Sequence, residues 1–583
     1  MIVYRAQTRV VNAAARLAEL RRAARELRAT ARPEHDAIRN LVADFGVLEA
    51  AVVDTLSPDR DALTPVVEQW RTTSEAIAAL FVASWEGAAT RELREHASAA
   101  GAALDALAGV PAPTAVSEGV PEGFAYYGLS PEQYAVAARR LAQQRIGRDA
   151  LCIGVRGIGA ALSSVATAAL RRVGWRVRSF TVRPRGHPFA RELALAPSLE
   201  RALRALSHSL VVVADEGPGL SGSSFASVSR ALAALGVPDE RIVLMPSFVP
   251  DGSAFISDAA RDRWRRHEKI VASFDEVWLE SGRLCRDASL GAQPLADRSA
   301  GAWREVAYES ASRWPAVHPQ HERRKFGAVM GDGTRVRLEF AGYGRAGREA
   351  IARATRLAHS GITLAPRSLA AGFLVVPELE CAPLDGATAS AETIDAVAAY
   401  LAHLDRSCHT GDGANAAALA ELVAINAREA LGEDVGPAVA RWHRAAGAID
   451  APAVALDARI FPHEWLRTRD GLVKTDAVVH HDDHFYPGPQ DIAWDLAATC
   501  VELSLDAAAR RALGERFIAH GGDRDAPRRT PIVEVAYLAF RVGYATLARD
   551  TLGQSDDGWR WRREVPRYAH RLRRVLERLA DAA

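Results

Sequence analysis

The sequence has few of the residues from which a disulfide framework or a structural zinc site is built. Its 583 residues include five cysteines, which are scattered and never form a CxxC pair. An odd number of dispersed cysteines argues against both kinds of cross-link. No stretch approaches the roughly 18 uninterrupted apolar residues of a membrane span, and the arginine-containing N-terminus has no long apolar core. We therefore expect no membrane span and no secretory signal, and predict a cytoplasmic protein. The abundance of Ala and Arg is typical of a GC-rich bacterial genome.

The chain also lacks an excess of charge of either sign. It has 73 basic and 72 acidic residues, with a net charge of +1. No global field would attract nucleic acid or a membrane surface, so any anion binding has to be local. The segment Trp559–Arg574 interleaves arginines with aromatic residues, as nucleic-acid binders do, but it reads better as a solvated terminal helix. The expected partners are small molecules, with no membrane, nucleic acid unlikely to bind, and a homo-oligomer left open.

The length suggests several domains. We predict a helical extension over 1–122, because apolar residues repeat at spacings of three and four from Val10 onward, and a Pro-rich linker begins at Val110. Over 123–296, short apolar strands alternate with amphipathic helices, which indicates an α/β unit with a parallel sheet. Residues 297–322 are polar and predict a second linker. Residues 323–583 begin with a hairpin around Gly331-Asp332-Gly333 and continue as helices, which indicates an α+β unit.

The strongest motif follows the apolar strand Leu210–Ala214. Two acids, Asp215 and Glu216, come first, and a loop rich in glycine and serine then leads into a helix. Glycines allow backbone N–H groups to approach a phosphate, and the helix N-terminus favours an anion. The acids would repel a phosphate but suit the two hydroxyls of a ribose, directly or through Mg²⁺. The predicted phosphate-binding residues are Gly217, Gly219, Ser221, Gly222, Ser223 and Ser224.

This motif resembles the phosphoribosyl pyrophosphate (PRPP) motif of type I phosphoribosyltransferases. Asp215 and Glu216 match its acidic pair and Ser221–Ser224 its phosphate cradle, although the segment Gly217–Leu220 is one residue longer than usual. In that family a loop after the first strand binds pyrophosphate, and a mobile loop after the second closes over it. The resemblance therefore assigns Arg156 and Gly157 to the first of these loops. It assigns Arg183, Arg185 and His187 to the second.

The resemblance implies a pentosyl-transferring enzyme that uses Mg-PRPP, or the reverse pyrophosphorolysis, with an unidentified base-like acceptor. The sugar becomes cationic while the pyrophosphate gains charge, so the expected catalytic residues are Asp215 and Glu216 for the sugar and Arg183 and Arg185 for the leaving group. Magnesium would be held by Asp215 and Glu216, directly or through water.

A second resemblance covers roughly Arg323 to Ala583. Asp483 lies eight residues before Asp491, and Trp494-Asp495-Leu496 follows. This pattern is similar to the aminoglycoside-phosphotransferase and choline-kinase-like fold, where the first of two such acids binds metal. The resemblance implies a kinase-like unit in which Lys474, Asp476, Asp483 and Asp491 form a polar cluster. Asp483 would be a metal ligand, and ATP would be an uncertain further ligand.

The second unit departs from the kinase pattern at three positions. Glu339 occupies the expected place of the strand lysine, and Arg459 and Glu464 occupy those of the catalytic-loop Asp and Asn. Phosphoryl transfer depends on positioning and charge neutralisation, so these changes predict an atypical kinase-like unit whose activity is doubtful. Three functions stay open: a phosphoribosyltransferase, a non-catalytic PRPP or nucleotide sensor, and a small-molecule phosphotransferase whose catalytic residues lie elsewhere.

Overall fold

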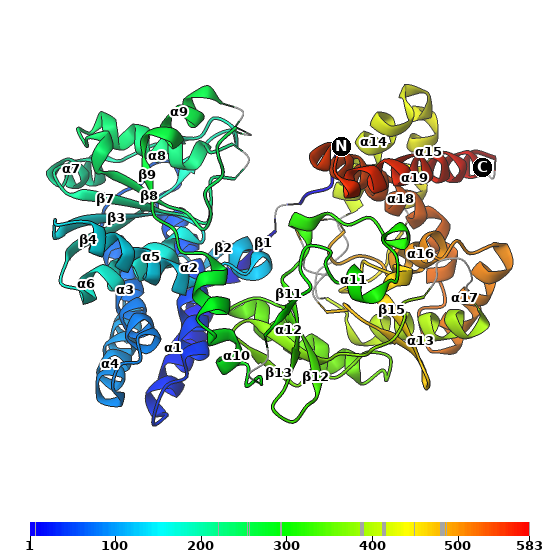
Figure 1. The fold of residues 1–583 in the computed structure, drawn as a ribbon. Coiled ribbons are helices and arrows are strands. Elements are labelled where there is room, and N and C mark those ends of the chain that lie inside the picture. The colour runs from blue at the N-terminus through cyan, green and yellow to red at the C-terminus, as the bar shows by residue number, and fades with distance from the viewer. Residues whose placement is uncertain are drawn as a thin grey trace.

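The computed structural model describes residues 1–5, 7–219, 221–253, 255, 257–291, 294–384, 390–410, 416–447, 449–478, 484–485 and 487–581. The chain forms a mixed α/β protein with two units side by side (Figure 1). The first contains the N-terminal helices and a parallel sheet, and the second contains an antiparallel sheet and a large helical lobe. None of the described helices combines the length and apolarity that crossing a bilayer requires.

The N-terminal helices form as the apolar periodicity predicts. They are α1 (Ala13–Ala29), α2 (His35–Leu56), α3 (Pro65–Trp85) and α4 (Thr90–Leu107). The Thr64 side chain caps α3, which has proline at its first position, where no backbone donor is needed. Val10 differs from the prediction, because it lies in strand β1 (Thr8–Asn12), which pairs antiparallel with β2 (Ala115–Gly119) in the predicted linker. β-Branched residues favour this pairing over helix.

The parallel sheet is confirmed. Its strand order is β4-β3-β7-β8-β9, and every pair in it is parallel. The order reverses between β3 and β7, so their carboxyl ends border a crevice where ligands bind in such sheets. Its elements, with the small antiparallel pair β5–β6 after β4, are η1 (Gly123–Tyr127), α5 (Pro131–Gln144), β3 (Asp149–Val155), α6 (Gly159–Arg172), β4 (Arg176–Val182), β5 (Pro184–Arg185), β6 (Glu192–Leu193), α7 (Pro197–Ala205), β7 (Leu210–Ala214), α8 (Ser223–Ala234), η2 (Asp239–Arg241), β8 (Ile242–Met245), α9 (Asp258–Arg266), β9 (Glu268–Lys269), η3 (Asp275–Glu280) and α10 (Arg283–Asp287).

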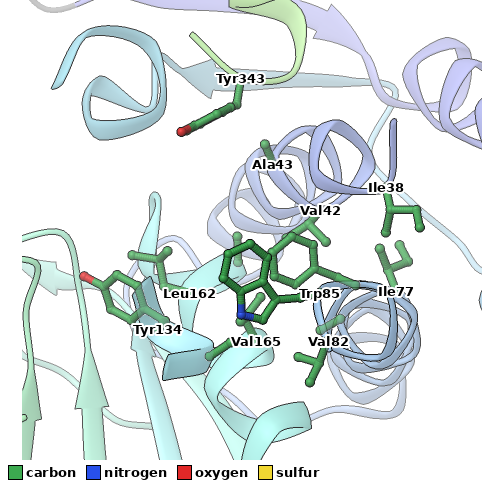
Figure 2. Close-up of a cluster of buried hydrophobic side chains, with 14 of the residues drawn as sticks. Ile38, Val42, Ala43, Ile77, Val82, Trp85, Tyr134, Leu162, Val165 and Tyr343 are labelled. Atoms are coloured by element: carbon green, nitrogen blue, oxygen red, sulfur yellow. The ribbon is translucent and has the colours of Figure 1, made fainter. Parts of the chain in front are cut away.

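The N-terminal helices share one hydrophobic core with the parallel-sheet segment. Figure 2 shows Ile38 and Val42 of α2 and Ile77 of α3 around the core that Leu162 and Val165 of α6 also enter. At Gly46 of α2 an added Cβ would lie 2.6 Å from the Ala161 Cβ, so glycine is what allows α2 to approach α6. Helices α1–α4 therefore belong to the same hydrophobic core as the parallel-sheet segment.

The second unit begins with a five-stranded antiparallel sheet of order β10-β11-β12-β14-β13. Helix α12 connects its third strand to the next, and a helical lobe follows. The elements are β10 (Ala296–Asp297), α11 (Arg304–Ala307), η4 (Ala311–Arg313), η5 (Pro319–His321), β11 (Lys325–Val329), β12 (Arg335–Phe340), α12 (Arg345–Ala358), β13 (Ser368–Ala370), β14 (Phe373–Pro377), α13 (Ala391–Ser407), α14 (Ala416–Leu431), η6 (Glu433–Val435), α15 (Gly436–Ala446), η7 (Pro462–Glu464), β15 (Trp465–Thr468), β16 (Gly471–Lys474), α16 (Ala493–Glu502), α17 (Ala507–Ala519), α18 (Ala526–Leu552) and α19 (Asp556–Asp581).

The segment 297–322, predicted as a linker, is part of the second unit. Arg304 forms a buried bidentate ion pair with Asp557 at the start of α19, at 2.6 and 2.9 Å. The indole Nε1 of Trp561 donates to the Val317 carbonyl at 3.1 Å. These contacts fix the segment against the helical lobe, where it forms a wall of the cavity described below.

The N-terminal residues cross from the first unit to the helical lobe of the second (Figure 1). Val3 is buried in the core of that lobe. The Ile2 N–H donates to the Asn426 side chain at 2.6 Å, and the Asn426 Nδ2 donates back to the Ile2 carbonyl at 2.7 Å. The Arg5 N–H also donates to the His484 carbonyl at 2.9 Å. The chain therefore joins the two units at its start as well as between β9 and β10.

Candidate functional site

The predicted acid pair lies at the carboxyl end of β7, beside the point where the strand order reverses. The Tyr134 hydroxyl donates to the Asp215 carbonyl at 2.6 Å, and the Ser247 N–H donates to the Glu216 carbonyl at 2.8 Å. Gly159 makes the crevice possible, because an added Cβ would lie 2.6 Å from the Ala214 oxygen. The sequence prediction therefore places these acids at the edge of the sheet where ligands bind.

Loss of solvent changes the acidity of this pair. Burial raises the pKa of Asp215 to about 7. Burial, together with repulsion from Glu122 and Asp215, raises the pKa of Glu216 to about 8. At neutral pH both carboxyl groups are therefore partly protonated, and a bound cation would favour their ionised forms.

The pair makes stability depend on pH with a definite sign. In the unfolded chain both acids ionise at about pH 4, so the folded protein retains protons that the unfolded chain has lost. Its free energy of unfolding should fall as the pH rises from about 4 to about 8, by at most about 1.4 kcal/mol per pH unit for each acid. Urea denaturation at several pH values should show a shallower slope for the Asp215→Asn/Glu216→Gln double variant. Identical slopes would contradict the raised pKa values.

The predicted phosphate loop is covered by the loop after β4. The hydroxyls of Ser221 and Ser223 both donate to the Pro188 carbonyl, at 2.9 and 2.6 Å. Gly222 has φ 64° and precedes α8, while Gly219 has φ 57° and is exposed. Gly217 and Ser224 are partly exposed beside them. The residues assigned to the cradle are thus gathered at one place, with two hydroxyls occupied by the covering loop.

The arginines predicted to bind pyrophosphate are held by acids of the N-terminal helical segment. Arg156 is buried and pairs with both Asp54, at 2.7 Å, and Asp61. Arg183 Nε lies 3.0 Å from Asp54, and Arg185 Nη2 lies 2.9 Å from Asp61. All three guanidinium groups are therefore engaged in internal ion pairs in this structure, and their assigned role stays a prediction.

Gly157 and His187, which were assigned to the same two loops, make contacts of a different kind. Gly157 has φ 123°, with nothing within 4 Å of an added Cβ, so it serves the turn after β3. His187 accepts a hydrogen bond from the Phe189 N–H at 3.3 Å and stays in the covering loop. Neither contact directs a charged group at the crevice.

The second unit contains a cavity of about 610 Å³ between its sheet and its helical lobe. It is enclosed by residues 303–322, here called the 303–322 wall, by the loop before β15 and by helices α18 and α19. Such a volume suits a small-molecule ligand. Charged side chains that line it include Lys325, Arg337, Arg459, Glu464 and Asp476.

A lysine and an acid meet directly in this cavity. Lys325 of β11 places its Nζ 2.5 Å from Asp476 and 3.8 Å from Glu339. Lys325 and Glu339 are partners in the β11–β12 register, so the lysine stands next to the position predicted for it on β12. Burial and repulsion from Asp476 raise the pKa of Glu339 to about 7. The sequence search missed Lys325 because it considered one strand only.

The loop before β15 is fixed from both sides. The Asp495 carboxylate accepts hydrogen bonds from the N–H groups of Asp457 and Ala458, at 2.8 and 3.1 Å. The guanidinium of Arg353 in α12 donates to the Ala455 and Leu456 carbonyls, both at 3.0 Å. This geometry places Arg459 and Glu464, five residues apart, on a constrained loop at the cavity.

Lys474 also lies in this region, where it holds the acids of the loop. Its Nζ is 2.8 Å from Glu464 and 3.2 Å from Asp457. Burial, with repulsion from Asp476 and Asp457, raises the pKa of Glu464 to about 8. Lys474, at the end of β16, and Asp476, in the loop that follows, therefore do come together, as the sequence predicted.

The pair Asp483 and Asp491 has a different outcome. Asp491 accepts hydrogen bonds from Arg529 at 2.6 and 2.9 Å and from the Ala493 N–H at 3.0 Å, so it serves the start of α16. Asp483 lies outside the described residues. In the part of the chain that the structure describes, no three or more His, Cys, Asp or Glu side chains gather to hold a metal ion by themselves.

Comparison with known proteins finds similar solved structures that cover about half of this chain. No protein-family model and no curated protein matches the chain. A choline/ethanolamine kinase family protein from Mesorhizobium loti is 15% identical, covers 52% of this chain and 99% of its own, and has a TM-score of 0.34. The solved structures that match include kinases and phosphotransferases of small molecules.

Two other matches are of the same kind. A macrolide 2′-phosphotransferase from Brachybacterium faecium is 15% identical, covering 48% of this chain and 98% of its own, at a TM-score of 0.33. An aminoglycoside phosphotransferase from Alicyclobacillus acidocaldarius is 14% identical, covering 44% and 90%, at a TM-score of 0.30. The comparisons lend no support to the phosphoribosyltransferase resemblance of the first unit.

Proposed function

We propose that the cavity of the second unit binds a nucleoside triphosphate and that this unit transfers the terminal phosphoryl group to a small molecule. The observation that carries the proposal is the Lys325–Asp476 pair. Kinases use a strand lysine to hold the nucleotide phosphates and an acid of the adjoining loop to hold the metal. Lys325 supplies a cation from β11, and Asp476 supplies the acid, although neither occupies the position that the sequence pattern indicated.

The carboxylates of the cavity fit a phosphate-bridged magnesium ion better than a metal held by protein alone. Magnesium in kinases is bound by one or two carboxylates and by the substrate phosphates. Asp476 and Glu464 repel each other, as the raised pKa of Glu464 indicates, so a cation between them would relieve that repulsion. When bound, the ion would neutralise charge on the phosphates. Asp476 is the residue that would hold it.

The loop departs from kinases where the acceptor would bind. Arg459 stands in the place of the catalytic Asp, so it would stabilise the charge of the transferred phosphoryl group instead of accepting a proton. The oxygen of an acceptor hydroxyl would bond to the terminal phosphorus while the bond to the nucleoside diphosphate breaks. Glu464, with a pKa near the physiological range, is the group to accept the hydroxyl proton.

Calorimetry with ATP tests the proposal directly. We expect ATP to bind to the purified protein with an affinity that magnesium increases, and ADP to be released when small hydroxyl compounds are supplied. ATP binding without ADP release under any acceptor would favour a sensor. No ATP binding would remove the proposal.

A second candidate, PRPP binding and pentosyl transfer at the first unit, is favoured by one specific observation. The two acids and the serine-rich loop meet at the reversal of strand order, as a site for a ribose 5-phosphate requires. Against it, the arginines expected to hold pyrophosphate are engaged by Asp54 and Asp61.

For this candidate we expect the Asp215→Asn/Glu216→Gln double variant to lose PRPP affinity at least about tenfold, because the ribose hydroxyls lose both ionised acceptors. Calorimetry with Mg-PRPP measures the loss, and circular dichroism verifies the fold. The neighbouring acid Asp251, which is exposed and bonded only to Ser253 in the described structure, offers Asp251→Asn as a control. Equal PRPP affinity in wild type and double variant would exclude this site.

A further inference from the structure

Helix α2 contacts the arginines of the first candidate site with its last turn and the start of α12 in the second unit with its first half. It has 22 residues and is therefore about 33 Å long at 1.5 Å per residue. Its first half faces the second unit and its last turn faces the arginines of the first.

The first half of α2 holds the start of α12. The Gly344 N–H donates to the Asn40 side chain at 2.8 Å, and the Arg345 N–H donates to Asp44 at 2.9 Å. Arg348 adds an ion pair with Asp44 at 2.6 Å. An acid at a helix N-terminus satisfies free N–H groups and the helix dipole, so Asp44 fixes where α12 begins.

The last turn of α2 holds the arginines beside the phosphate loop. Asp54 pairs with Arg156 and Arg183, and Asp61, just beyond the helix, pairs with Arg156 and Arg185. Burial opposes ionisation of Asp54, yet hydrogen bonds from Arg183 and Arg156 keep its pKa below the usual value. A diphosphate offers these guanidinium groups more charge and more acceptor oxygens than two carboxylates do.

Helix α12 carries the connection on to the cavity. Its Arg353 is 2% exposed and donates to the carbonyls of Ala455 and Leu456. The next residue of that loop, Asp457, is bonded by its own N–H to Asp495. A shift of α12 would therefore be transmitted to the loop that bears Arg459 and Glu464.

We propose that α2 couples the two sites, so that a diphosphate-bearing ligand that displaces Asp54 and Asp61 from their arginines weakens nucleotide binding in the cavity. This inference rests on the proposed function for its readout in the cavity. Without such a ligand, both ends of α2 are held and α12 keeps Arg353 on the loop. With it, the last turn of α2 is released, and the hold of Asn40 and Asp44 on α12 loosens. By thermodynamic linkage, the nucleotide weakens diphosphate binding by the same factor.

The test uses the full chain, with inorganic pyrophosphate and Mg-ATP as the probes. We expect the ATP dissociation constant to rise at least about fivefold at saturating pyrophosphate, and the reverse titration to give the same factor. Asp54→Asn should increase pyrophosphate affinity, because it removes a competitor for Arg183. Asp44→Asn should leave the affinity for each ligand alone nearly unchanged while it reduces the coupling. Asp105→Asn, which breaks an exposed ion pair with Arg21 on other helices, is the matched control and should change neither.

Direct competition of pyrophosphate for the ATP cavity is a distinct outcome. It would persist unchanged in Asp44→Asn, and that result would overturn the proposal. Failure of pyrophosphate to bind, or equal pyrophosphate affinity in Asp54→Asn and wild type, would also overturn it.

A readout without ATP separates this proposal from the proposed function. Hydrogen exchange of the Gly344 and Arg345 amides should become faster when pyrophosphate binds the wild-type protein, because these N–H groups bond to α2. If ATP does not bind but these amides respond, the proposed function fails and the coupling stands. If pyrophosphate binds and these amides do not respond, the coupling fails whatever ATP does.

Discussion

Replacing Lys325 by methionine is expected to lower ATP turnover at least about 100-fold, the range in which loss of one charge-stabilising group falls. Lys325 is the cation that meets Asp476 in the cavity, and methionine keeps most of its length without the charge. Turnover is measured as ADP release, and affinity as ATP binding by calorimetry. Both should fall, because the lysine would contact the phosphates before and during transfer.

The neighbouring residue provides a matched control. Arg324 directs its side chain at Asp275, and its guanidinium lies over the Phe274 ring, in the first unit. Arg324→Met should therefore leave turnover within about twofold of wild type, a change near the usual range of surface substitutions. Normal turnover in Lys325→Met, with an intact melting temperature, would show that phosphoryl transfer does not depend on this lysine. Asp476→Asn then tests whether the acid acts without it.

Replacing Arg39 by methionine is expected to lower the free energy of unfolding by about 3–5 kcal/mol, because it leaves a buried carboxylate without its main partner. Arg39 of α2 is 1% exposed and lies 2.5 Å from Glu132, which is 0% exposed. Its guanidinium also lies 5.0 Å from the Trp278 ring and 5.1 Å from the Tyr343 ring. The ion pair thus stands where α2, α5 and the second unit meet.

Urea denaturation measures this effect, and a double variant identifies its cause. Arg39→Met/Glu132→Gln removes the unpaired charge and should recover most of the loss, since a buried pair replaced as a whole costs little. Arg91→Met breaks the exposed Arg91–Glu95 pair of α4 and should change stability by less than about 1 kcal/mol. A loss in Arg39→Met no greater than in Arg91→Met would mean that Glu132 finds another partner.

Local patterns were sufficient to predict the alternating strands and helices of the parallel sheet, but not the β1–β2 pair. The strands β3, β4, β7 and β8 are short apolar runs that helices separate, so their periodicity and their turns point to the same structure. The position of Asp215 and Glu216 follows from the same pattern, because the carboxyl ends of parallel strands share one edge. Sequence reasoning therefore located this candidate site without knowledge of any contact.

Contacts between distant residues limited the rest. Arg156 reads as a ligand for an anion, but its partners Asp54 and Asp61 lie about a hundred residues earlier, and no local rule connects them. Lys325 was not predicted because it lies on β11, whereas the pattern places the lysine on β12; the register brings the two positions side by side. The 297–322 segment was predicted as a linker because it is polar. Arg304 in this segment pairs with Asp557 of α19, and no local pattern reveals such a contact.

The N-terminal residues connect the first unit to the helical lobe of the second unit. Val3 is seated in the core of the helical lobe, while β1, a few residues later, is paired within the first unit. A hinge motion that separated the two units would expose the Val3 side chain to water. Separation of the two units therefore carries the free-energy cost of exposing that apolar surface.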